Sequence, residues 1–186
     1  DAAQKSVLHL LNLLPNNANY ALLTLGNTNN TIHSCDQTDS MLLFPWGSSE
    51  EARPKITTAI PRGQSSLTNA ITQGLDKLVS SNLPANAAKT LIIIIRGGDN
   101  CVASENEWSA LESIVEEANN LGIQVSTELI ILVDEEIDEE TEKFLETIQR
   151  IGLNANISKV SNKEELDTII TEQVVFSLPA AAIPTV

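Results

Sequence analysis

Several residues whose types allow chemistry stand at the ends of segments that read as strands. The apolar run at 91–95 is followed by Arg96, two glycines and Asp99, and Ser65 stands just before a predicted helix. In an open parallel sheet, the loops that follow the strands gather at one edge. Oxygen ligands gathered there suit a hard cation, whereas a guanidinium suits a carboxylate. This predicted edge is therefore the candidate binding surface.

Nucleophilic or metal-assisted catalysis is disfavoured by the same residues. A nucleophilic Ser65 or Ser66 would need a nearby base, and neither His9 nor His33 follows a predicted central strand. Gly97-Gly98 lacks the spacing of a dinucleotide or phosphate-loop fingerprint. The two histidines and two cysteines are too scattered for a zinc cage. We therefore expect no catalytic residues and no enzyme.

The length and charge of the chain narrow the classes of protein to which it can belong. The chain has 186 residues, which fits one domain with a core of its own. Its 25 acidic and 11 basic residues give a formal charge of −14, which repels nucleic acid. No apolar run approaches the roughly 20 residues that span a bilayer. The start at Asp1 suggests a processed product or a fragment.

Hydrophobic periodicity predicts the elements that position these residues. The expected helices cover residues 2–14, 66–81, 104–121, 138–151 and 161–176, and the expected strands 19–26, 41–44, 91–95, 123–133 and 157–160. Pro45 favours an edge strand before it, and residues 50–60 read as an irregular or helical turn. The alternation predicts a mostly parallel sheet with helices on both faces. Residues 1–176 form the predicted domain, and 177–186, with two prolines, a tail or linker.

Two capping boxes and several segments in a fixed order add detail. Ser104 with Glu107, and Ser161 with Glu164, have capping-box spacing. The order of six segments resembles that of von Willebrand factor A (VWA) domains. They are GQSSLTNAI, TLIIIIRGGDNC, an amphipathic helix, a strand, DEETEKFLETIQRIGL and SNKEELDTII. Ile95–Asn100 parallels the Asp-Gly-Glu-Asp-Asn that follows a strand in that family. The resemblance, closest to an extracytoplasmic prokaryotic branch, implies a Rossmann-like α/β fold.

The resemblance also implies a disulfide and an export route. That branch carries one cysteine after its second strand and one after its fourth, which correspond here to Cys35 and Cys101. The alternative is two unpaired buried thiols. A bridge would stabilise the fold by ~4 kcal/mol in the chain-entropy model and would need an oxidising compartment. The expected location is extracellular, at the cell surface or periplasmic.

The family's metal site is degenerate in this chain. The resemblance implies a site in which three loops hold Mg²⁺ or Mn²⁺. The first of these loops, Asp-x-Ser-x-Ser, is absent here together with its strand. Ser65 matches the second loop, and Arg96 stands where the third-loop Asp is expected. A divalent ion ~4 Å from a guanidinium would meet on the order of 8 kcal/mol of repulsion at a dielectric of about 20. We therefore expect no metal and no cofactor.

Other interpretations of this edge stay open. Arg96 could lean into solvent while Asp99 or Asp36 keeps some affinity for Mg²⁺ or Ca²⁺. Alternatively, Arg96 could itself hold the carboxylate of a protein partner. The acidic residues between Asp134 and Glu142 could bind Ca²⁺, but a solvated face at a helix start is the favoured interpretation. Asn29 and Asn156 lie in glycosylation patterns, which matter only in a glycosylating source.

The absent first strand leads to one further expectation. In the family it lies centrally, so its loss would leave two interior strand edges unpaired. We expect it to be supplied by an upstream segment of a precursor, a cleaved fragment or a neighbouring subunit. The leading function is a non-catalytic binding or adhesion module that uses Ser65, Arg96 and Asp99. The alternatives are a structural subunit of an extracellular assembly and, third, a small-ligand or enzymatic α/β domain.

Overall fold

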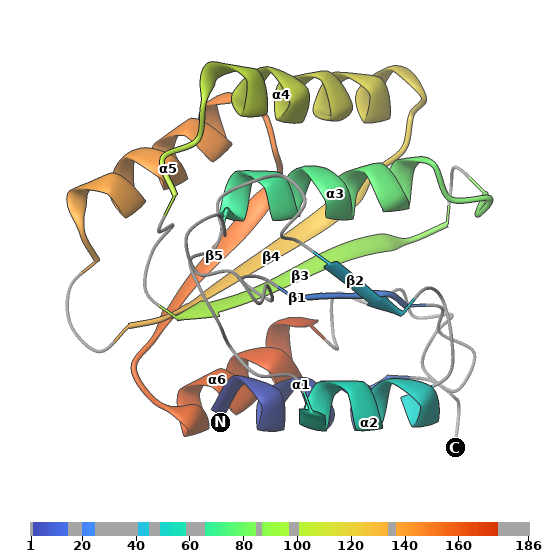
Figure 1. Cartoon of the computed structure of the whole chain (residues 1–186), viewed down its shortest axis with the longest axis vertical. Coiled ribbons are helices and arrows are strands. Elements are labelled where there is room, and N and C mark those ends of the chain that lie inside the picture. The colour runs from blue at the N-terminus through green and yellow to red at the C-terminus, as the bar shows by residue number, and fades with distance from the viewer. Residues whose placement is uncertain are drawn as a thin grey trace.

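A computed structural model describes residues 2–14, 20–24, 41–44, 49–58, 66–84, 87–96, 101–133 and 137–174. The elements are α1 (Ala2–Leu13), β1 (Leu22–Thr24), β2 (Met41–Phe44), α2 (Ser49–Thr58), α3 (Leu67–Val79), β3 (Lys89–Arg96), α4 (Glu105–Asn120), β4 (Val125–Leu132), α5 (Glu139–Arg150), β5 (Ala155–Val160) and α6 (Lys163–Ile169), which continues as a π-helical turn (Ile170–Val174). Helices α3, α4 and α5 lie on one side of the strands and α1, α2 and α6 on the other (Figure 1). None of these helices is both long and apolar enough to cross a membrane.

Side-chain caps explain where four of the helices begin. Ser66, Ser104, Asp138 and Asn162 each accept a hydrogen bond from a backbone N–H in the first turn of α3, α4, α5 and α6. The predicted box of Ser104 and Glu107 is confirmed. The other predicted box is wrong by one residue, because Asn162 rather than Ser161 is the cap. Both residue types cap well, so the pattern alone could not separate them.

Helix α2 is longer than the turn expected for residues 50–60. It runs for ten residues although Pro54 lies inside it and removes one backbone donor. Ala52, two residues before Pro54, and Ile56, two residues after it, are both buried. They form a cluster with Leu11 of α1. Tertiary packing therefore holds a helix that local propensity disfavours.

The strands form two separate hydrogen-bonded sheets. β3, β4 and β5 are parallel in that order, and β1 and β2 form an antiparallel pair. The predicted parallel sheet with helices on both faces is thus confirmed for β3 to β5. β2 is an edge strand among the described residues, as the proline after Phe44 predicted.

The three-stranded sheet buries a different cluster on each face. On the α3/α4/α5 face, Leu129 and Ile131 pack with Ile71, Leu111 and Ile148, all fully buried. Trp108 lies at the margin of this cluster, with its ring centroid 5.5 Å from that of Phe144. On the α1/α6 face, the smaller cluster consists of Leu10, Ile130, Val160, Leu166 and Ile170. Successive side chains of β4 point to opposite faces of the sheet, because a strand has a two-residue period.

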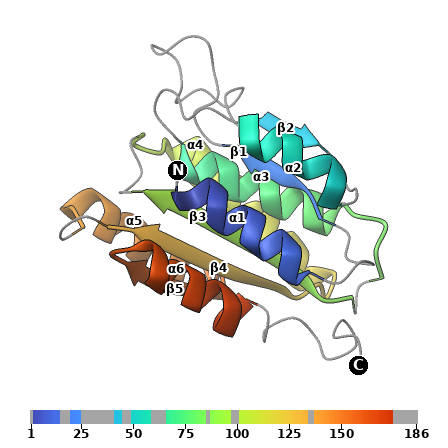
Figure 2. The ribbon, with the colours of Figure 1, turned by 90° about the horizontal axis from the view of Figure 1, so that it is seen from below.

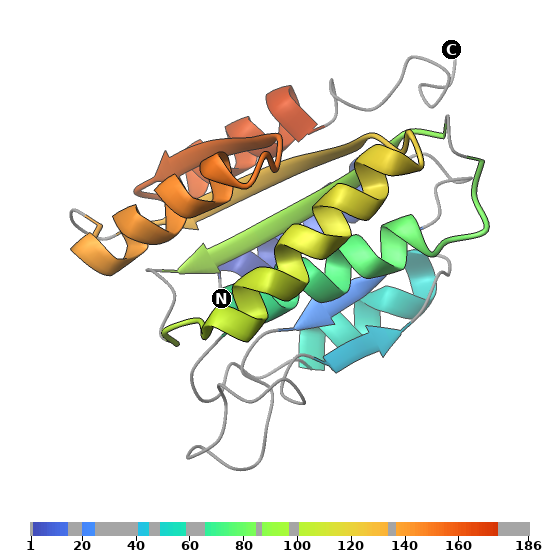
Figure 3. The same cartoon turned by 90° about the horizontal axis from the view of Figure 1, so that it is seen from above.

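Helix α1 joins the two sheets. Leu10 packs under the three-stranded sheet, whereas its neighbour Leu11 packs with α2 and near Leu22 of β1. Seen from below, α1 lies across the space between β1 and β3 (Figure 2), and the view from above shows α1 behind the same space (Figure 3). No backbone ladder joins β1 to β3 within the described residues. As far as the described residues go, β1-β2 and β3-β4-β5 are therefore two sheets with α1 packed against both.

Glycines end two crossover helices at the positions where the sequence predicted stops. Gly122 follows α4 with φ +65°, and Gly152 follows α5 with φ +79°. A residue with a side chain is strained in this left-handed region, which glycine adopts freely. A third glycine, Gly74 in α3, lets that helix approach Leu91 of β3 so closely that a Cβ would meet its methyl group at 2.6 Å.

Candidate functional site

The carboxyl ends of the parallel strands meet at one edge of the sheet. Arg96, the last residue of β3, lies beside Leu132, which in turn lies beside Val160 at the end of β5. Helices α4, α5 and α6 each begin shortly after one of these strands. Loops of an open α/β sheet that lie at this carboxyl edge are the usual place for ligand contacts. Residue 96 is therefore at the predicted binding edge, on the backbone of β3.

A carboxylate connects the starts of α3 and α4 at this edge. Glu107 accepts hydrogen bonds from the backbone nitrogen and hydroxyl of Ser104, at 2.7 and 2.8 Å, with Oε2. Its other oxygen, Oε1, accepts from the Ser66 hydroxyl at 3.2 Å. Ser66 in turn caps α3 by accepting from the backbone N–H of Asn69. The two helix N-termini, which carry partial positive charge, thus share one negative side chain.

The geometry around Ser66 indicates a structural hydroxyl. Its side chain is 3% exposed, its oxygen already accepts a backbone hydrogen bond and its proton points to Glu107. The next hydroxyl along, that of Thr68, is buried and has no hydrogen-bond partner among the described residues. A nucleophile needs access to substrate and a base free to take its proton. Ser66 has neither, because Glu107 is occupied as a cap.

Of the remaining residues predicted for the site, the structure describes only Cys101. Cys101 is buried just before α4, and the exposed Val102 follows it. Ser65, Asp99 and Cys35 lie outside the described residues. The contact between Ser66 and Glu107 was missed by the sequence reasoning. The capping-box spacing marked Glu107, but no local pattern links it to a serine 41 residues away.

Only part of the acidic run Asp134–Glu142 falls within the described residues, and Asp138 is the cap of α5. A hydrogen bond from the backbone N–H of Thr141, at 2.7 Å, holds the pKa of Asp138 below its ordinary value. In the described parts of the chain, no three His, Cys, Asp or Glu residues are grouped so as to hold a metal ion. Asp138 therefore acts as a helix cap, in line with the favoured interpretation of a helix start.

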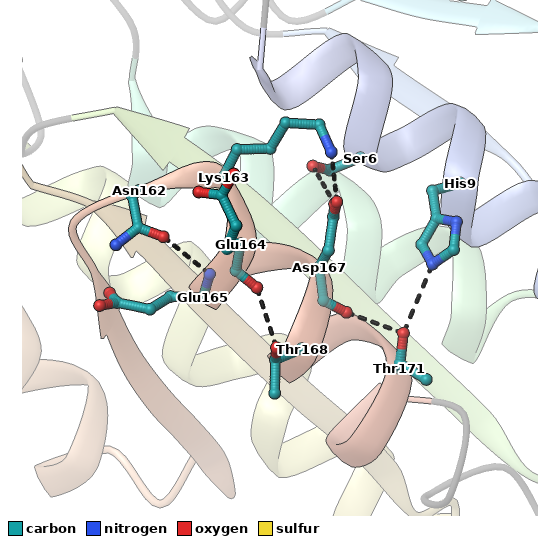
Figure 4. Close-up of polar contacts among 9 residues, drawn as sticks. All are labelled: Ser6, His9, Asn162, Lys163, Glu164, Glu165, Asp167, Thr168 and Thr171. Atoms are coloured by element: carbon teal, nitrogen blue, oxygen red, sulfur yellow. Dashed lines mark hydrogen bonds and ion pairs between the residues drawn. The ribbon is translucent and has the colours of Figure 1, made fainter.

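A second polar cluster joins α1 to α6 on the far side of the sheet (Figure 4). The buried Ser6 donates its hydroxyl proton to Asp167 Oδ1 at 2.9 Å, and Lys163 forms an ion pair with the other oxygen. His9 Nε2 lies 3.4 Å from the hydroxyl oxygen of Thr171. Partial burial raises the pKa of Asp167, but Lys163, Ser6 and the charge of His9 outweigh it and lower the pKa.

Ser6, His9 and Asp167 match a hydrolytic triad in residue type but not in arrangement. Ser6 contacts Asp167 directly, and no hydrogen bond joins Ser6 to His9 within the described residues. A triad needs the imidazole between the hydroxyl and the carboxylate. We refer to Ser6, Lys163 and Asp167 as the α1–α6 clamp, because Ser6 of α1 bonds to Asp167 of α6, which also pairs with Lys163 one turn earlier in α6.

Another buried acid lies in the sheet itself. Glu128 of β4 is 2% exposed and accepts a hydrogen bond from the side-chain amide of Asn156 on β5 at 2.8 Å. Asn156 is the second of the two possible glycosylation positions, and the first, Asn29, lies outside the described residues. A glycan on Asn156 would replace one of the amide protons through which it satisfies Glu128.

Comparison with known proteins shows the fold. No protein-family model matches the chain, and no curated protein matches it in sequence. The structure of a von Willebrand factor type A protein from Catenulispora acidiphila superposes with a TM-score of 0.67 and 12% identity, over 95% of this chain and 38% of that one. The open conformation of the pilus adhesin SpaC from Lactobacillus rhamnosus GG gives 0.61 and 11%, over 95% and 28%.

These likenesses cover nearly the whole of this chain, but the chain spans well under half the length of either protein. At such low identity they speak for the arrangement of elements and not for shared residues. The parallel β3-β4-β5 sheet, its crossover helices and these superpositions together show that the chain has a VWA-like, Rossmann-like α/β fold.

Proposed function

We propose that the chain is a non-catalytic, extracytoplasmic protein-binding module of the adhesion type, whose metal site is disabled. The observation that carries the proposal is the end of β3: Arg96 occupies the carboxyl edge at the position where the resemblance places a metal-binding Asp. The likeness in fold to a pilus adhesin supports a role in protein interaction. The partner surface is formed by the loops around Cys35, Ser65, Arg96 and Asp99.

A guanidinium at residue 96 favours an anionic group over a cation at this one position of the edge. The N-termini of α3 and α4 each add about half a positive charge, and Arg96 adds a full one. The first turn of α4 carries Glu105 and Glu107, and three hydrogen bonds from Ser66 and Ser104 already occupy Glu107. A carboxylate from a protein partner would pair with the guanidinium fork in two parallel hydrogen bonds.

A metal titration tests the disabled site. The thermal midpoint of the wild-type chain is expected to stay constant as Mg²⁺ or Mn²⁺ is added, whereas Arg96→Asp restores a carboxylate and is expected to gain a metal-dependent rise. Arg150→Asp, at the end of α5 away from this edge, is the charge-matched control and should gain none. A metal-dependent rise in the wild type would overturn the proposal.

The extracytoplasmic part of the proposal rests on a bridge between Cys35 and Cys101. It is supported by the burial of Cys101 at the carboxyl edge and by the absence of a free cysteine from the described residues. Denatured, unreduced protein should show no reactive thiol, and reduction should lower the free energy of unfolding by ~4 kcal/mol. Two titratable thiols before reduction would count against export to an oxidising compartment.

A second candidate is a structural subunit of an extracellular assembly. It is favoured by the lack of a ladder between β1 and β3 among the described residues, because an unpaired sheet edge is a place where another segment can join. Light scattering over a range of protein concentrations separates the two candidates. A binding module stays monomeric, whereas an assembly subunit grows in mass with concentration.

A further inference from the structure

One of the two tryptophans of the chain lies between α4 and α5 and is only partly buried. Trp108, in the first turn of α4, packs at the margin of the larger apolar cluster, and its ring centroid is 5.5 Å from that of Phe144 on α5. α4 (yellow) and α5 (orange) lie side by side on the same face of the sheet (Figure 3). The two rings therefore fill the space between the helices. Tryptophans that keep an exposed part are enriched among the residues that dominate protein interfaces.

Glutamates flank these two rings on the surface. Residues three or four positions apart are neighbours on a helix. This spacing places Glu105 and Glu112 beside Trp108, and Glu140 beside Phe144, and all three glutamates are exposed. The other neighbours at this spacing are the serine cap of α4, a partly buried threonine and residues buried under the helices. We refer to the two aromatic residues and these three glutamates as the α4–α5 seam.

No basic residue of α4 or α5 balances the charge of the seam. Helix α4 contains no Lys or Arg at all. In α5, Lys143 forms its ion pair with Glu139, and the one other basic residue lies in the last turn. Within the described residues, Glu105, Glu112 and Glu140 form no ion pair. The seam therefore presents three carboxylates that remain available to a cation from outside.

The helix dipole accounts for two of these carboxylates but not for the third. Glu105 and Glu140 lie in the first turns of their helices, where a negative charge is favourable. Glu112 lies in the middle of α4, beyond the reach of that effect. A metal ion is not the explanation either, because in the described part of the chain no three His, Cys, Asp or Glu residues are grouped so as to hold one. Carboxylates spread around an aromatic ring suit a larger organic cation.

We propose that the α4–α5 seam binds an arginine side chain of a protein partner. A guanidinium is planar and stacks on the exposed part of the Trp108 indole, which attracts its charge. The guanidinium fork pairs with a carboxylate through two parallel hydrogen bonds, and the three glutamates offer such a carboxylate on either side of the rings. The formal charge of −14 draws a basic segment toward the chain. The seam thus binds a group opposite in charge to the carboxylate proposed for Arg96.

Titration with an arginine peptide gives the first test. The probe is acetyl-Gly-Arg-Leu-Arg-Gly-amide, and the control peptide has citrulline, which is neutral and nearly identical in shape, in place of both arginines. At a salt concentration of about 150 mM, the arginine peptide is expected to shift the nuclear magnetic resonance signal of the Trp108 indole N–H, with a Kd below about 1 mM. The citrulline peptide should not shift it. No shift with arginine, or equal shifts with both peptides, would overturn the proposal.

The second test removes the charges of the seam. A variant in which its three glutamates are replaced by Gln is expected to bind the arginine peptide about tenfold more weakly, and exposed Glu→Gln changes leave the fold intact. The matched control replaces three exposed glutamates of the same helices that lie away from Trp108 and Phe144. These changes are Glu117→Gln, Glu142→Gln and Glu146→Gln. The control should lose no more than about twofold in affinity. Equal losses in the two variants would mean that overall charge binds the peptide, which overturns the proposal.

Two single variants complete the test. Trp108→Leu removes the ring and keeps an apolar side chain, so the folded variant is expected to bind the arginine peptide about threefold more weakly. Unchanged affinity in that variant would overturn the stacking on the indole.

Arg96→Asp separates the seam from the carboxyl-edge site, with which it shares only the premise that the chain binds a protein. Peptide affinity should stay within about twofold of the wild type, because the seam does not include Arg96. Loss of peptide binding in Arg96→Asp, with binding retained in the seam variant, would overturn the proposal. A metal-dependent rise in the wild type would instead overturn only the disabled metal site and leave the seam unaffected.

Discussion

The two faces of the parallel sheet are closed by different means. On the α3/α4/α5 face, helices pack through Ile71, Leu111, Ile148 and other fully buried apolar residues. On the α1/α6 face the apolar cluster is smaller, and the α1–α6 clamp adds partly buried polar contacts beside it. The first face thus depends on apolar area, and the second on area together with hydrogen bonds whose strength depends on protonation.

The two faces should therefore respond differently to mutation and to pH. Apolar packing at high density has no titratable part and tolerates little change of volume. A hydrogen-bonded clamp between two helices can be weakened by a single proton on Asp167. The α1/α6 face also lies beside the space between β1 and β3, which no ladder bridges within the described residues.

Two neighbouring residues on β4 compare the faces most directly. Ile131→Ala, on the α3/α4/α5 face, is expected to lower the free energy of unfolding by about 4–5 kcal/mol, near the top of the range for buried Ile→Ala changes. Ile130→Ala, on the α1/α6 face, is expected to cost about 2–3 kcal/mol, because a smaller cluster can relax around the cavity. Urea unfolding of both variants checks this; a larger loss for Ile130→Ala would reverse the comparison.

The clamp should show an asymmetry between its two ends. Asp167→Ala leaves the buried hydroxyl of Ser6 without its acceptor and is expected to cost about 1–3 kcal/mol. Ser6→Ala removes that donor altogether, while Asp167 keeps Lys163, and should cost less. Equilibrium unfolding near neutral pH measures both, and equal losses would mean that the Ser6 hydroxyl finds another acceptor.

Acid should weaken the same clamp. The pKa of Asp167 lies below its ordinary value of 3.8 in the folded chain. A carboxyl group with a lowered folded pKa contributes stability above its unfolded pKa, and this is lost as the pH falls through the folded pKa. Stability measured from pH 6 down to pH 2 should therefore fall less steeply in Asp167→Asn than in the wild type. Parallel curves would exclude the clamp as a source of acid sensitivity.

Breaking the shared cap at the carboxyl edge should have a moderate effect. Ser104→Ala removes the acceptor for the N–H of Glu107 and frees part of its carboxylate, at an expected cost of about 1 kcal/mol. Ser104→Asp, which can still cap α4 but places a second carboxylate beside Glu107, should recover only part of the loss. A thermal melt of the two variants against wild type is the measurement.

The smallest effect is expected from the exposed ion pair on α5. Lys143 and Glu139 are one turn apart, 2.6 Å between nitrogen and oxygen, with side chains 68% and 80% exposed. Lys143→Ala should change the free energy of unfolding by no more than about 0.5 kcal/mol. A loss comparable to that of Ser104→Ala would show that surface charge, and not packing and caps, holds the α3/α4/α5 face.

The sequence predicted elements best where one local signal dominated. The Ile run of β3 and the Ser104 box of α4 both appear at the expected places, because strand composition and capping act over a few residues. Residues 50–60 were expected to hold an irregular or helical turn, and the length of α2 could not be predicted because Pro54 opposes helix formation and the burial of α2 against α1 leaves no local trace. The cap of α6 was misplaced by one residue because Ser161 and Asn162 cap equally well.

The same division holds for the candidate site. The position of Arg96 at the carboxyl edge was predictable, since it depends only on where β3 ends. The contacts of Ser66 with Glu107 and of Ser6 with Asp167 were not, because each joins residues distant in sequence. Such pairs depend on how helices dock, which periodicity does not encode. The location of the carboxyl edge was thus predictable from the sequence, and the side-chain contacts within it were not.

The placement of Leu10 and Leu11 in α1 has a mechanical consequence. Consecutive helical residues point about 100° apart, so these two side chains anchor α1 in two clusters on different sides of its axis. Turning the helix to improve one anchor would withdraw the other. A pulling force on α1 would therefore act on both sheets together, and α1 could neither rotate nor slide without removing Leu10 or Leu11 from its cluster.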